Sequence, residues 1–368
     1  LEVIEVYQRD NFSRHGMSYE TVASYFEKQL KLEQREATGL MKLLFEKYGA
    51  DSKSRYENHR TYLFLKNLES EVWYAADDLG YRVKFKGASV ASLIGADVNA
   101  GVYHLEEYNE YLIFIGQGLL FFLDAIMRSA ICLFEWKSSG GYRLSQQHAL
   151  DEMNRRPEIV RYVVEAYSAF LRADLPSILS LTPPKVPSHM ESTYGALRHA
   201  AWLFVIGHEY SHIFHGDVGE DHSISVDVIR AANGSPLRHK LEWQKEFAAD
   251  ARGFEFMNHV MNFRYGCNAE FNMMASVAFF ASVDSLYRQI ERITGFVVAN
   301  KNSTHPAPIP RWQTVASAIF GAVDDMSIES FESAEKLADI IEVIHSFVEL
   351  NLIATQDRKE IADIWCRS

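Results

Sequence analysis

The stretch AWLFVIGHEYSHIFHGD, residues 201–217, joins an apolar run to two histidines that are four residues apart. On a helix, side chains at i and i+4 share one face, so His208 and His212 can hold one metal ion. Glu209, between them, can reach a water molecule at the same place. The apolar residues before His208 suit a helix that crosses a folded core. The stretch therefore predicts a buried, metal-binding helix, which we expect to run from near His189 to Gly216.

The HExxH pattern alone is a modest signal, because it arises by chance in roughly 0.04 of chains with this length and composition. A catalytic zinc ion takes three protein ligands and leaves one position open. The best third ligand is Glu246 in EFAAD, 34 residues after His212 and on a predicted helix of its own. Asp250, one turn later on the same face, can accept the free ring N–H of a ligand histidine. The alternative is a solvated helix face with i,i+4 ion pairs. We expect one zinc ion per chain.

Glu209 is the expected general base, which takes a proton from water as the water attacks a polarised carbonyl. A developing oxyanion needs a further donor, and the candidate is His305 in THPAPIPRW, with Arg311 in reach of the same cluster. A lone loop histidine is more often only solvated. We therefore assign His305 a catalytic role and Arg311 a supporting role as hypotheses.

Two other histidines lie near the motif. The metzincin pattern HExxHxxGxxH is excluded, because His215 stands where that pattern has glycine and Val218 stands where it has histidine. His215 is expected at the surface or behind the ligands. His199 lies on nearly the opposite side of the helix from His208, where core packing is its expected role.

The composition is that of a folded globular protein, with 48% hydrophobic and 23% charged residues. A formal net charge of -12, without any Lys/Arg cluster, argues against a nucleic-acid partner. The most apolar stretch, residues 111–134, contains Asp124 and Arg128, and its uncharged part is shorter than the ~20 residues of a membrane-spanning helix. We expect no stable membrane insertion and an Asp124–Arg128 ion pair. Three widely spaced cysteines and an acidic beginning without a signal-peptide pattern favour a cytoplasmic protein.

The periodicity of apolar residues predicts a mainly α protein with a small antiparallel β-sheet, an α+β fold. Residues 1–88 are expected to form a helical region that serves as a scaffold or a regulatory cap. Residues 89–320 are expected to form the catalytic domain, with the sheet near its beginning. Residues 321–368 are expected to form C-terminal helices packed on that domain.

The motifs, and their order along the chain, resemble those of the gluzincin metallopeptidases of the HtpX heat-shock-protease and CAAX-prenyl-protease family. HEYSHIFHGD resembles the active-site helix of the family, EFAAD its ExxAD motif and THPAPIPR its histidine-proline segment. VNAGVYHLEEYNEYLIFIGQGLL resembles its Asn-Ala strand and the elements that follow. The resemblance covers about residues 97–315 and implies a zincin-like core. It also implies that Asn99 and Ala100 border the cleft, where a peptide substrate adds as a strand.

Members of that family are mostly integral membrane proteins, whereas this chain lacks their spanning helices. It is also similar, on weaker grounds, to the bacterial Lit peptidases of phage exclusion, which are helical and cytosolic. We therefore expect a soluble, bacterial zinc endopeptidase that acts on a restricted set of proteins and leaves room for a regulatory partner. The alternatives are a zinc-stabilised peptide-binding sensor or adaptor without turnover, and a hydrolase of a non-protein amide.

Overall fold

The structure is a computed structural model, and it describes Glu5, Gln8 and residues 59–81, 87–93, 100–105, 110–137, 141–172, 174–218, 236–295, 308, 311–316, 328–352 and 361. Helices predominate among these residues and a small sheet accompanies them, so the predicted α+β class is confirmed. The chain divides into two compact units. The first comprises Leu1–Leu120 with Ile213–Ile224, and the second Phe121–His212 with Ser225–Ser368.

Among its described residues, the first unit contains a three-stranded sheet and a helix that packs on it. Helix α4 (His59–Asp78) lies against β1 (Gly87–Leu93). The other strands are β2 (Ala100–Leu105) and β3 (Glu110–Gly116), and the strand order is β1-β3-β2. The central strand β3 is the most apolar one, as its two neighbours require.

The prediction of a purely antiparallel sheet is wrong for one of its two pairings. Strand β2 pairs with β3 antiparallel, as expected for neighbours in sequence, but β1 pairs with β3 parallel. The reason is that β1 occupies the far edge of β3 instead of the position beside β2. Strand patterns do not encode that choice of edge, because it depends on which partner buries the apolar face best.

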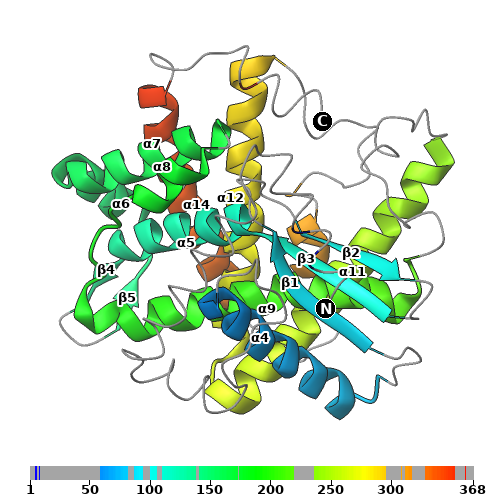
Figure 1. Cartoon of the computed structure of the whole chain (residues 1–368). Coiled ribbons are helices and arrows are strands. Elements are labelled where there is room, and N and C mark those ends of the chain that lie inside the picture. Colours follow the sequence, from blue (N-terminus) through cyan, green and yellow to red (C-terminus); the bar gives the residue numbers. More distant parts are fainter. Residues whose placement is uncertain are drawn as a thin grey trace. The chain divides into compact units, whose positions relative to one another are not determined.

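The second unit is a helical assembly (Figure 1). Most of α5 (Gln117–Cys132) belongs to it, as does all but the end of α9 (Glu191–His215), which follows a 3₁₀ turn at Ser188–Met190. Within the described ranges, the unit also contains further helices and a short antiparallel strand pair: α6 (Gln146–Arg155), α7 (Pro157–Leu171), α8 (Leu175–Ser180), α11 (Pro236–Tyr265), α12 (Ala269–Thr294), α14 (Ile328–Leu352), β4 (Glu135–Trp136) and β5 (Tyr142–Arg143).

The ends of helices α9 and α12 are set by residues close to them in the sequence. Helix α9 ends where Gly216 takes a φ of 70°, as predicted from the sequence. Helix α12 begins at Asn268, whose side chain accepts the Phe271 N–H, and it ends at Gly295 with a φ of 77°. Helix α14 packs along α12 and also contacts α6 and α7 (Figure 1).

The apolar stretch at residues 111–134 forms β3 followed by α5, not one long helix. Asp124 and Arg128 form the predicted i,i+4 ion pair, with 3.4 Å between Oδ2 and Nε. Among the described residues, no helix combines the length and the apolarity that crossing a membrane requires.

Candidate metal centre

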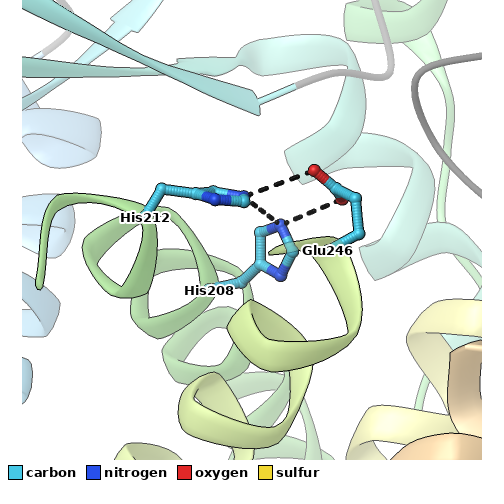
Figure 2. Close-up of side chains that lie close together, drawn as sticks. All are labelled: His208, His212 and Glu246. Carbon is cyan, nitrogen blue, oxygen red and sulfur yellow. Dashed lines mark hydrogen bonds and ion pairs between the residues drawn. The ribbon is translucent and has the colours of Figure 1, made fainter. Parts of the chain in front are cut away.

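Three side chains from α9 and α11 converge on one point of the second unit (Figure 2). His208 and His212 come from successive turns of α9, and Glu246 comes from α11. The two Nε2 atoms are 3.1 Å apart. Glu246 Oε1 lies 3.4 Å from His212 Nε2, and Oε2 lies 3.6 Å from His208 Nε2. The two imidazole nitrogens therefore lie close to each other, and each faces a different oxygen of the Glu246 carboxylate.

The separations of these nitrogen and oxygen atoms fit a zinc ion. A tetrahedral zinc ion with ligand distances of 2.0–2.2 Å separates neighbouring ligand atoms by about 3.4 Å. The observed distances of 3.1, 3.4 and 3.6 Å are within 0.3 Å of that value, and two imidazoles with one carboxylate are a common zinc ligand set. His208 and Glu246 are each only 7% exposed, so bulk water competes little for the position. Among the described residues, no other group of His, Cys, Asp or Glu side chains converges in this way.

Asp250 and Arg311 contact the candidate ligands from behind. Asp250 Oδ1 lies 2.9 Å from His208 Nδ1, a contact that favours the tautomer with its proton on Nδ1 and its lone pair on Nε2. Arg311 donates from Nε and Nη2 to the two Asp250 oxygens at 2.8 and 2.6 Å. Its Nη2 also lies 3.2 Å from Glu246 Oε2. The Arg311 guanidinium thus orients two carboxylates: that of Glu246, a candidate ligand, and that of Asp250, which contacts the candidate ligand His208.

The charge of Asp250 is maintained by this arrangement. Burial alone would raise the pKa of its carboxyl, because Asp250 is fully buried. The Arg311 guanidinium and the His208 ring outweigh burial and hold the pKa well below its usual value. Asp250 is therefore an anion that can stabilise the orientation and the basicity of His208.

Glu209 lies on α9 between the two histidines and is 7% exposed. Burial raises the pKa of its carboxyl, and the neighbouring His208 and His212 rings act in the opposite direction. Glu246 adds to the rise and Arg311 opposes it. Glu209 thus interacts electrostatically with the three candidate ligands and with Arg311.

Two residues of α12 belong to the surroundings of the centre and were not predicted. The Arg311 guanidinium lies 5.3 Å from the centroid of the Phe280 ring, which covers it on one side. Burial raises the pKa of the Tyr287 phenol, which also interacts electrostatically with Arg311 and Glu246. Neither residue stands out in the sequence, because an aromatic side chain in an apolar helix is normally core.

Two glycines at the contact of α9 with α11 were also not predicted. Gly207 precedes the first histidine, and Gly253 lies one turn after Asp250. Both lie inside helices, where glycine is disfavoured unless close packing or function requires it. That rule was a usable signal in the sequence.

The remaining predicted residues have different outcomes. His305 and Asn99 lie outside the described residues, so their predicted roles are untested. Ala100 is the first residue of β2, which lies at an edge of the sheet in the first unit. The His199 ring packs on Tyr265 with 5.0 Å between centroids, and His215 is exposed with Nδ1 3.8 Å from Asp217.

No family model matches the chain, and no match was found among the curated proteins or the solved structures. The resemblance to gluzincins therefore rests on the motifs, and the side-chain geometry is an independent observation beside it.

Proposed function

We propose that the chain is a zinc-dependent endopeptidase with a zincin-like core of the gluzincin kind. In this proposal His208, His212 and Glu246 bind one zinc ion, and Glu209 is the general base. The observation that supports it best is the convergence of two imidazole nitrogens, 3.1 Å apart, on the Glu246 carboxylate, whose two oxygens lie 3.4 and 3.6 Å from them. A solvated acidic helix face, the alternative for Glu246, would not give a carboxylate that is 7% exposed between two imidazoles.

Zinc at such a site supplies Lewis acidity, which polarises a substrate carbonyl and makes an attacking water more acidic. Glu209 accepts the proton of that water as its oxygen adds to the carbonyl carbon, and then delivers the proton to the nitrogen as the C–N bond breaks. Burial raises the pKa of this carboxyl, so it binds the proton of that water more strongly than an exposed glutamate would.

The other residues of the centre act on these groups. Asp250 holds the His208 ring through Nδ1, and Arg311 holds Asp250 and limits the rotation of Glu246. In the part of the proposal that rests on the resemblance alone, His305 donates to the developing oxyanion. On the same ground, a peptide substrate pairs with the strand that begins at Asn99 and Ala100.

We propose protein substrates because an edge strand recognises an extended backbone, which a small amide lacks. Strand β2 supports this choice, since it is an end strand in the order β1-β3-β2. The restricted range of substrates stays an inference from the resemblance.

The test compares new protein N-termini in cells that express the wild type or Glu209→Gln. We expect a small set of N-termini that only the wild type produces, because the amide cannot accept the proton. Zinc measured in the two purified proteins should be equal at about one ion per chain, since Glu209 is not a ligand. Identical N-termini in both cells, with zinc present in both proteins, would favour the peptide-binding adaptor.

A further inference from the structure

Helices α9 and α11 are in close contact at two glycines beside the candidate metal centre. Gly207 is the residue before His208, and Gly253 lies on the face of α11 that also presents Glu246 and Asp250, at a spacing of i, i+4 and i+7. The Gly207 carbonyl, on the same turn of α9, accepts the Ser211 hydroxyl at 2.7 Å. On its own helix, each glycine therefore lies within two helical turns of the candidate ligands.

A side chain at Gly253 would collide with the backbone of a metal ligand. A Cβ atom there would lie 2.8 Å from His208 N, 3.0 Å from His208 Cα and 3.1 Å from the Phe204 carbonyl oxygen. Ordinary contacts of a Cβ atom begin at 3.4 Å. All three neighbours are backbone atoms of α9, so no side-chain rotation can relieve the collision, and the two helices would have to separate.

Gly207 faces the same contact from the other helix. A Cβ atom at Gly207 would lie 3.1 Å from the Gly253 carbonyl oxygen and 3.2 Å from Gly253 Cα. These distances are tighter than most Cβ contacts but less severe than those at Gly253. The other glycine of α9, Gly195, differs from both, since a Cβ atom there would meet nothing within 4 Å.

We propose that Gly207 and Gly253 are positioning residues that set the separation of α9 and α11, and thereby the distance of Glu246 and Asp250 from the two histidines. The inference rests on the proposed zinc binding. A shift of about 0.6 Å would be needed to bring the closest contact at Gly253 to van der Waals distance. Metal–ligand distances tolerate only about 0.2 Å. Three ligands spread over two helices thus form a zinc site only where the helix backbones can touch.

The experiment measures Zn²⁺ affinity by competition with a chromophoric chelator, on protein first freed of metal, together with helix content and urea unfolding of the metal-free form. The variants are Gly253→Ala, Gly207→Ala, Gly195→Ala and Val260→Ala. Gly195→Ala is the matched control for a glycine-to-alanine change in a helix. Val260 is fully buried on α11 two turns from Gly253, so Val260→Ala reports what a general loss of packing does.

We expect Gly253→Ala to lower the Zn²⁺ affinity at least ten-fold, which is the size of effect known for residues that orient metal ligands. Gly207→Ala should lower it by a smaller factor, and both control variants should bind Zn²⁺ as the wild type does. Alanine is the better helix former, so helix content of the metal-free protein should not fall through propensity.

The proposal is overturned if a folded Gly253→Ala binds Zn²⁺ within two-fold of the wild type, or if Val260→Ala loses as much affinity as Gly253→Ala. If Gly253→Ala does not fold, Gly207→Ala decides, and unchanged affinity in that folded variant also overturns it. A wild type that binds no Zn²⁺ overturns the proposed function as well. Wild-type binding with unaltered glycine variants would refute only the positioning role.

Discussion

The metal centre and the contact of α12 with α14 are built from the same kinds of side chain. In each, an arginine lies between two carboxylates, and a histidine is near. The members are Arg311, Asp250, Glu246 and His208 in the first cluster, and Arg288, Asp284, Glu342 and His345 in the second. Arg311 is 11% exposed at its side chain, whereas Arg288 is 41% exposed.

The two clusters use these side chains differently. Arg288 binds Glu342 through both terminal nitrogens and Asp284 through Nε, so both carboxylates are ion-paired with the arginine. In the metal centre Glu246 instead faces two imidazoles, because α9 contributes His212 as well as His208. Proximity of charged residues is therefore not enough to form a set of candidate metal ligands. Two imidazoles on one helix face and close contact with a second helix are also needed.

The largest difference should come from removing each arginine. Arg311→Met leaves the fully buried Asp250 without its charge partner, and we expect the free energy of unfolding to fall by about 3–5 kcal/mol. Arg288→Met breaks a partly exposed network, where about 1 kcal/mol or less is expected. Urea unfolding of the metal-free proteins measures both. Equal losses would mean that burial does not distinguish the two clusters.

The second cluster should respond to acid through His345. Burial, with Arg288 adding and Glu342 opposing, lowers the pKa of His345 from 6.5 to about 4. Between these values the unfolded chain binds a proton that the folded chain does not, so the contribution is complete above pH 6.5 and is lost as pH falls to 4. The expected loss is about 3 kcal/mol.

The corresponding measurement is the free energy of unfolding across pH 4 to 7 for the wild type and His345→Gln. Other groups titrate in the same range, so the difference between the two curves isolates His345. We expect that difference to change steadily with pH over this window. Parallel curves would show that the pKa of His345 is the same in the folded and the unfolded chain.

A third contrast concerns zinc. Asp250→Asn keeps the shape of the side chain but loses the charge that supports His208, and we expect Zn²⁺ affinity to fall about 10- to 100-fold. Glu342→Gln makes the same chemical change in the second cluster and should leave affinity unaltered. Isothermal titration with Zn²⁺ compares them. A fall of similar size in both variants would point to a general effect of charge.

The smallest effect should be that of Glu342→Gln on stability. The side chain of Glu342 is 45% exposed and its ion pair is screened by solvent, so we expect the free energy of unfolding to change by about 1 kcal/mol or less. A loss as large as that of Arg311→Met would contradict the contrast between a buried and a partly exposed cluster.

Features set within a few residues were predicted well. The spacing of His208 and His212 requires only helical periodicity, and the end of α9 requires only a glycine that can take a positive φ. The pair Asp124–Arg128 follows from the same i,i+4 rule. The parallel direction of β1 was missed, because it depends on the position of a strand relative to a partner that comes later in the chain.

The sequence by itself determined that one helix presents two imidazoles on one face, since the α-helical repeat decides this locally. It also offered Glu246 and Asp250 as partners one turn apart. Only the tertiary structure decided that α11 lies against α9 closely enough for Glu246 to reach both rings. That depends on Gly253 meeting the His208 backbone and on Arg311 arriving from a distant segment. Such contacts result from packing over the whole unit, which no local repeat specifies.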